Sequence, residues 1–184
     1  MRYGMKKFCM ILPLALIVCF MVGCQDKEAM AELEEFKAQA EVEEQNKDMV
    51  KRYVDELNKG NSAVFEELCA PEYAFYNPSD TPEPMSREET MEFHEMIHTA
   101  FPDVNWDVKE LSATGDRVII WNVVTGTHEG EFMGIPATGN KIDVSSILML
   151  RIQNGKIIEE REEADMLGLM QQLGMELKPK EAKK

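Results

Sequence analysis

The feature that most constrains the fold is a change of hydrophobic period just past the middle of the 184-residue chain. Before Pro102 the apolar residues recur at helical spacing. After it, four segments are rich in β-branched and aromatic residues: 104–113, 117–127, 141–152 and 156–164. Thr114-Gly115-Asp116 and Gln153-Asn154-Gly155 separate neighbouring segments and are good hairpin turns. Helices followed by an antiparallel meander predict an α+β fold, with a curved sheet wrapped around helices.

Three helices are expected ahead of the meander, starting near Lys47, Ser62 and Ser86. The last has Glu89 three residues after Ser86, the spacing of a capping box. A short strand is expected at 73–76. The 117–127 segment is apolar on both faces, which predicts a central strand with helices on one side. A dimer partner or a ligand cavity would cover the other side.

The N-terminus has the pattern of an export signal. Three basic residues precede an uncharged apolar run, 8–22, which is shorter than the ~20 residues of a membrane-spanning helix. The run ends in Met21-Val22-Gly23-Cys24, which resembles the lipobox of bacterial lipoproteins. An ordinary signal peptide with an incidental cysteine is the alternative. We expect residues 1–23 to be removed and Cys24 to carry lipid.

The same reasoning divides the mature chain. Residues 24–44 form an acidic, helix-prone linker, residues 45–177 form one domain, and residues 178–184 form a basic flexible tail. Cys69 is then the one thiol of the domain, expected to be a small buried side chain without a disulfide partner.

Charge limits the partners. The chain has a net charge of −14, and removal of residues 1–23, with three basic and no acidic residues, makes it −17. Such a surface excludes nucleic acid as a partner and disfavours electrostatic attachment to anionic lipid. The lipid on Cys24 would therefore hold the domain outside the cytoplasm, at the bacterial cell membrane or outer membrane.

Several segments together resemble one family. They are Phe101-Pro102-Asp103, the glycine-rich segment 124–139, Gly155-Lys156-Ile157-Ile158-Glu159, and 165–174 with its closing Gln-Gln-Leu-Gly. Over roughly 46–175 the chain is similar to the SnoaL-like polyketide cyclase (ester cyclase) family of the NTF2-like superfamily.

The resemblance implies a cone-shaped barrel, in which three N-terminal helices and a strongly bent, mostly antiparallel sheet enclose a blind pocket. It also implies dimerisation through the outer sheet face, and ring closure by an intramolecular aldol reaction without metal or cofactor. One aspartate near the end of the last strand acts as general acid/base, and motif matching makes it Asp165. The expected activity is cofactor-independent chemistry of cyclase, isomerase or hydrolase type on a small hydrophobic carbonyl compound.

The expected pocket residues are Tyr76, Trp121, His128, Met133, Arg161 and Glu163. In a regular strand Glu159, Arg161, Glu163 and Asp165 share one face, with Glu163 ~7 Å from Asp165. Two like charges so close would raise the pKa of one of them. The alternative is that residues 159–163 form a solvated edge without chemistry.

Two departures from the family concern the pocket. Glu159-Glu160-Arg161 stands where Glu-His-Trp is common, and Tyr76 stands where histidine is common. They suggest a smaller or more anionic substrate. The alternatives to an enzyme are a ligand-binding lipoprotein and a structural or dimerisation module.

A metal site is the remaining question. His94 and His98 have the i,i+4 spacing that can chelate a metal, but the sequence offers no third ligand. We place both histidines at the polar edge of their helix and predict no metal.

Overall fold

The computed structural model describes residues 8–176 and 178, with side chains from residue 27 onward. The chain divides into two compact units, Met1–Val42 and Glu43–Lys184. Helix α1 (Phe8–Asn58) begins in the first unit, where the side chains of residues 27–42 are exposed. Residues 1–7, the side chain of Cys24 and most of the 178–184 tail lie outside the described residues, so the export signal and lipid site stay predictions. Within the described part, no helix is both long and apolar enough to cross a membrane.

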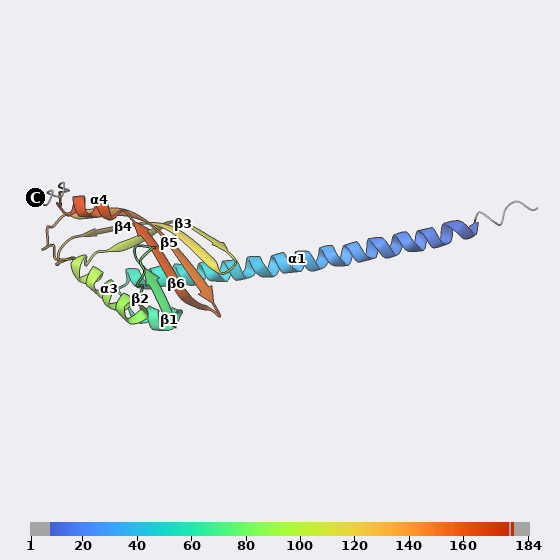
Figure 1. The fold of residues 1–184 in the computed structure, drawn as a ribbon, viewed down its shortest axis with the longest axis horizontal. Helices are drawn as coiled ribbons and strands as arrows, with labels where there is room; N and C mark the ends of the chain where they lie inside the picture. Colours follow the sequence, from blue (N-terminus) through green and yellow to red (C-terminus); the bar gives the residue numbers. More distant parts are fainter. Residues whose placement is uncertain (1–7, 177, 179–184) are drawn as a thin grey trace, which may run out of the picture. The chain divides into compact units, whose positions relative to one another are not determined.

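The second unit is built on a six-stranded sheet in the order β2-β1-β6-β5-β4-β3 (Figure 1). All neighbouring strands are antiparallel except β1 and β6, which are parallel. The strands are β1 (Cys69–Tyr76), β2 (Met85–Ser86), β3 (Asn105–Thr114), β4 (Arg117–Thr127), β5 (Lys141–Gln153) and β6 (Lys156–Ala164).

The predicted meander is confirmed, with β4 and β6 at the predicted bounds and β3 and β5 within one residue of them. Asn154 and Gly155 both have positive φ, as the β5–β6 hairpin turn requires. Two short elements were not predicted: the two-residue strand β2 and helix α4 (Met166–Gln172). Neither is long enough to give a hydrophobic period.

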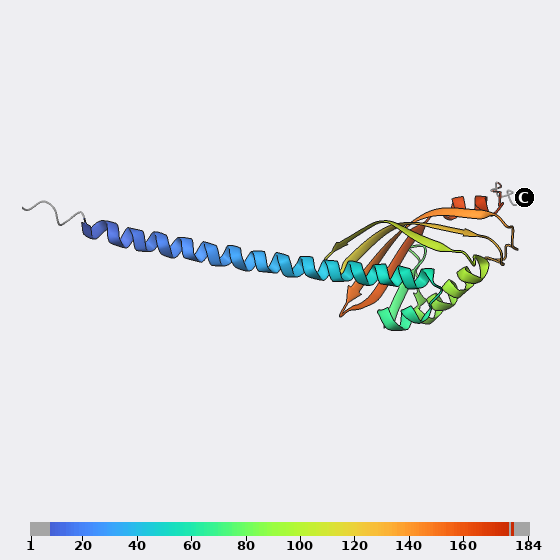
Figure 2. The ribbon, with the colours of Figure 1, turned by 180° about the vertical axis from the view of Figure 1, so that it is seen from behind.

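Helices cover one face of the sheet. They are residues 43–58 of α1, α2 (Ala63–Leu68) and α3 (Arg87–Ala100), and Figure 2 shows α1 and α3 on the same side. The predicted capping box of α3 is confirmed, since the backbone N–H of Glu89 donates to Ser86 Oγ and the Glu89 carboxylate accepts from Ser86 N–H. The helices pack on the buried side chains of β4 and β5, such as Val118, Ile120 and Leu150.

Considering the described residues alone, the outer face of the sheet at β4 and β5 is exposed. Side chains of β4 alternate, so Ile119 and Trp121 are 46% and 42% exposed while their neighbours are buried. Ile147, the β5 partner of Trp121, is 54% exposed. The helices cover one face of β4 as expected, and cover of the other face by a dimer partner stays a prediction.

The 128–140 loop packs against the end of α3. The backbone N–H groups of Glu129 and Gly130 both donate to the Ala100 carbonyl, at 2.9 and 3.0 Å. A Cβ at Gly130 would lie 2.5 Å from the Thr99 carbonyl oxygen, so only glycine allows this approach. The contact brings Phe132 of this loop to the core.

Candidate functional site

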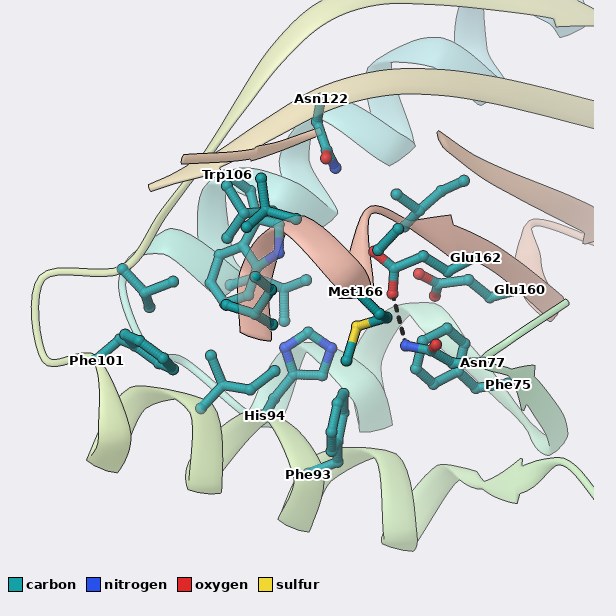
Figure 3. A pocket seen from close by; sticks show the side chains of 18 of the residues that line it. Phe75, Asn77, Phe93, His94, Phe101, Trp106, Asn122, Glu160, Glu162 and Met166 are labelled. Atoms are coloured by element: carbon teal, nitrogen blue, oxygen red, sulfur yellow. Dashed lines mark hydrogen bonds between the residues drawn. The ribbon is translucent and has the colours of Figure 1, made fainter. Parts of the chain in front are cut away.

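A cavity of about 530 Å³ is enclosed by residues of α1, α3, the sheet and the 128–140 loop (Figure 3). Its volume is in the range of small-molecule sites. Most of its wall is apolar, and its six aromatic residues are Tyr53, Phe75, Phe93, Phe101, Trp106 and Phe132. Strand β6 contributes the carboxylates Glu160, Glu162 and Glu163.

Glu160 is the deepest of these acids, with 2% of its surface exposed. The hydroxyl groups of Tyr73 and Tyr53 both donate to its Oε2 atom, at 2.7 and 3.1 Å. Burial raises the pKa of Glu160 to about 7, although the two tyrosine hydrogen bonds oppose the rise. A carboxyl with this pKa takes up or releases a proton near neutral pH.

Glu162 lies two residues further along the same face of β6. The side-chain amide of Asn77 donates to its Oε2 at 2.9 Å (Figure 3). Burial raises the pKa of Glu162, and the charge of Glu163 adds to the rise. Glu163 is exposed and binds the loop after β1, since it accepts hydrogen bonds from the backbone N–H and the hydroxyl of Ser79.

His94 enters the cavity from α3 and is 8% exposed. Its ring lies 5.2 Å from that of Phe65 and 5.5 Å from that of Trp106. Burial lowers its pKa to about 3, so the imidazole is neutral. The Nδ1 atom is buried and has no hydrogen-bond partner among the described residues.

The expectation that both histidines lie at the polar edge of α3 is wrong for His94. His98 is only partly buried at the edge of the helix, with its Nε2 atom 2.8 Å from the Leu57 carbonyl oxygen. Among the described residues there is no group of three or more His, Cys, Asp or Glu side chains that could hold a metal ion.

Asn122 adds a polar group on the sheet side of the cavity (Figure 3). Its Oδ1 accepts a 2.6 Å hydrogen bond from Ser146 Oγ, and both residues are buried. This bond fixes the amide, so its nitrogen remains the donor that a ligand can meet.

Of the predicted pocket residues, Met133 and Glu163 line the cavity. Tyr76 and Arg161 do not; they pair with each other instead, with the guanidinium 3.8 Å from the ring centroid. Arg161 also donates to Glu159 at 2.8 Å and to the Ser79 carbonyl at 2.7 Å. The side chain that suggested an anionic substrate is therefore committed elsewhere.

Trp121 and His128 also lie away from the cavity wall. Trp121 is on the outer sheet face and donates to Ser145 Oγ at 2.9 Å. His128 is fully buried behind the wall, stacked on Phe101 with ring centroids 5.1 Å apart and with Nδ1 3.0 Å from Thr138 Oγ1.

Asp165 is exposed and is not among the cavity residues. It is the N-cap of α4, and its Oδ1 accepts a 2.8 Å hydrogen bond from the Gly168 N–H. This contact gives Asp165 a structural role. No observation tests its catalytic role, which stays a prediction.

Glu160 and Glu162 were not predicted, because the pocket face of 159–165 was counted from Asp165 along a strand assumed to be regular, and β6 is irregular. Ile157 is buried, and counting from it in steps of two points Glu159 and Arg161 inward. The pairing register with β5 shifts between Arg151 and Ile152, so one extra residue in β6 reverses the inward face. In a run of charged residues, no periodic signal marks such a shift.

Comparisons with known proteins agree with this architecture. Residues 47–173 match the model of the SnoaL-like polyketide cyclase family. The chain belongs to this family.

The aklanonic acid methyl ester cyclase DnrD of Streptomyces peucetius is 30% identical over 131 residues, which cover 69% of this chain and 89% of DnrD. The crystal structure of a SnoaL-like protein from Jannaschia sp. CCS1 is similar with a TM-score of 0.66 and 25% identity, covering 73% of this chain and 95% of that one. IdmH of Streptomyces antibioticus gives a TM-score of 0.62 and 28% identity, covering 71% and 99%. The predicted fold class is thus confirmed.

Glu160 should make the stability of the domain depend on pH. Its pKa of about 7 in the folded state lies above the value of about 4.3 for an unfolded chain. The folded state therefore binds more protons between these values, and the contribution is full below about pH 4.3 and lost as pH rises through about 7. Compared with Glu160→Gln, the wild type should lose about 2–3 kcal/mol of unfolding free energy between pH 5 and 8.

Urea unfolding of both proteins at four pH values measures this difference. The control is Glu110→Gln, an exposed acid on β3 outside the cavity. Parallel pH profiles for the wild type and Glu160→Gln would show that Glu160 titrates normally.

Proposed function

We propose that this SnoaL-like domain is a cofactor-independent acid/base enzyme that acts on a small, largely apolar carbonyl compound. The observation that carries the proposal is the Glu162 carboxylate in an apolar cavity, with a pKa raised by burial. Proton abstraction next to a carbonyl needs a base whose pKa is near the working pH, and burial moves a glutamate toward it.

Glu162 is the best candidate for this base. It is less deeply buried than Glu160, which the two tyrosines hold, and less exposed than Glu163. The Asn77 amide fixes one of its oxygens, so the carboxylate has a defined orientation. The similarity to DnrD, whose name describes cyclisation of a methyl ester, supports this class of chemistry.

The carbonyl oxygen also needs a donor as negative charge develops on it. Neutral His94 and the amide of Asn122 are uncharged polar groups that could donate to it, since both line the cavity, His94 from α3 and Asn122 from β4. A neutral imidazole can donate an N–H without adding positive charge.

Proton abstraction can be measured without the natural substrate. The neutral ketone 2-tetralone in D₂O would exchange its acidic C–H protons, followed by NMR. We expect the wild type to accelerate exchange, with a rate that rises with pH as Glu162 ionises. Glu162→Gln should lower the enzymatic rate about 10²-fold or more, the usual contribution of a general base.

Asp165→Asn is the contrasting variant. Its exchange rate should stay within about twofold of the wild-type rate. Its free energy of unfolding should fall by about 1 kcal/mol or less, as for a weakened N-cap. Loss of exchange in Asp165→Asn with unchanged exchange in Glu162→Gln would return the catalytic role to Asp165. Binding without exchange in the wild type would favour a ligand-binding module.

We further propose that the domain is exported and attached to a membrane by lipid on Cys24. The lipobox-like Met21-Val22-Gly23-Cys24 and the preceding apolar run support this. Two or three acyl chains bind firmly where one chain binds only reversibly.

Cys24→Ser should abolish incorporation of a fatty-acid analogue and move the protein from the membrane fraction to the soluble fraction. Cys69→Ser is the control. Because Cys69 is buried in the domain, this substitution should leave labelling intact. Continued labelling of Cys24→Ser would contradict lipid attachment at this residue.

We also propose a homodimer through the outer sheet face. Its support is the exposed apolar group of Ile119, Trp121 and Ile147, which a second copy would remove from water. Trp121→Lys combined with Ile147→Lys should halve the mass in sedimentation velocity and leave the circular dichroism spectrum unchanged. A wild type that sediments as a monomer at high concentration would overturn this proposal.

A further inference from the structure

The charges around the cavity are all of one sign. Its lining contains Glu160, Glu162 and Glu163, and among the described residues that line it there is no lysine or arginine. Arg161 is next to two of these acids in the sequence, but its guanidinium is held by Glu159, Tyr76 and the Ser79 carbonyl. An anionic ligand would therefore enter a low-dielectric space that holds carboxylates and no counter-charge.

The basic side chain that does reach the cavity carries no charge. His94 is more than nine-tenths buried and points into the cavity (Figure 3). Its low pKa keeps it neutral at any physiological pH. Its Nδ1 atom, buried and without a hydrogen-bond partner in the described part of the chain, independently indicates a ligand, since buried polar atoms are almost always paired.

The acids themselves are arranged to accept a positive charge. Both tyrosine hydroxyl groups donate to Oε2 of Glu160, so Oε1 takes neither hydrogen bond. The charge of Glu162 raises the pKa of Glu160, and a cation between or beside the two carboxylates would relieve this repulsion. The aromatic walls add a second attraction, because ring faces attract organic cations.

The protein as a whole favours the same ligands. With a net charge of −14, the chain creates a negative potential that concentrates cations and repels anions near the cavity mouth. The carboxylates of the cavity and the net charge of the protein therefore both favour a cationic ligand.

We propose that the cavity takes a small apolar molecule that carries a protonated amine, held at Glu160, and that it rejects carboxylates. The inference rests on the proposed function, because it names the class of compound that the same cavity takes. The ammonium group would pair with the Oε1 side of Glu160, which leaves Glu162 for the carbonyl end of the molecule.

Three probes with one carbon skeleton separate charge from shape: 2-aminotetralin, 2-tetralol and tetralin-2-carboxylate. We expect calorimetry at pH 7 to give a Kd for the amine about tenfold or more below that of the alcohol, as for a charge-assisted hydrogen bond. The carboxylate should not bind measurably. Equal affinities of amine and alcohol, or tighter binding of the carboxylate, would overturn the proposal.

Two controls locate the effect. Glu160→Gln keeps the shape of the side chain and should reduce the amine's advantage over the alcohol to about threefold or less. Glu110→Gln removes the same charge from the exposed face of β3 and should preserve the amine's advantage. If both variants lost this advantage equally, the selectivity would come from the overall charge, and the role of Glu160 would be overturned.

A further measurement does not depend on any variant. Pairing with an ammonium lowers the pKa of Glu160, so binding of the amine at pH 7 should release a fraction of a proton, seen as a binding enthalpy that changes with the buffer. The alcohol should release none, and an amine that also releases none would contradict the pairing.

The two proposals can fail separately. Exchange of 2-tetralone with no preference for the amine would overturn the selectivity and leave the acid/base function standing. Preference for the amine without exchange would support the selectivity and overturn the enzymatic function.

Discussion

The hydroxyl groups of Tyr53 and Tyr73 both donate to one oxygen of Glu160, and this contact joins α1, β1 and β6 at the wall of the cavity. β1 and β6 are the one parallel pair in the sheet, so their register has no hairpin turn to fix it. The buried carboxylate provides that constraint instead, because a shift of one residue would place a charge in the core without its partners. With Glu160 in place, alternation along β6 directs Glu162 into the cavity.

The sequence predicted the fold more closely than it predicted the site, and the reason differs from element to element. β4 and β5 have continuous apolar patterns, and each is joined to a neighbouring strand by a clear hairpin turn. Their bounds could therefore be predicted from the sequence pattern. The inward face of β6 depends on a register shift near Ile152, which is a property of the pairing between strands. Asp165 was chosen by motif matching, which finds a position in the family pattern but not the hydrogen bond to Gly168 that uses its carboxylate.

Membership of the SnoaL-like family and the character of this cavity are separate facts. The sheet and its covering helices follow the family, as the match over residues 47–173 and the similarity to IdmH show. The polar side chains that line the cavity include three acids, a neutral histidine and two asparagines in a largely apolar wall. A fold can be shared while the chemistry is set by such a small group of side chains.

The loop after β1 is bound to β6 at three points. Asn77 donates to Glu162, Ser79 donates to Glu163, and the carbonyl of Ser79 accepts from Arg161. The loop is thus a second support for the carboxylates, supplied by a segment about 80 residues away along the chain. As a consequence, natural variation in this loop can retune proton affinity inside the cavity while β6 itself stays unchanged. Relatives with identical last strands can therefore differ in the pH at which they work.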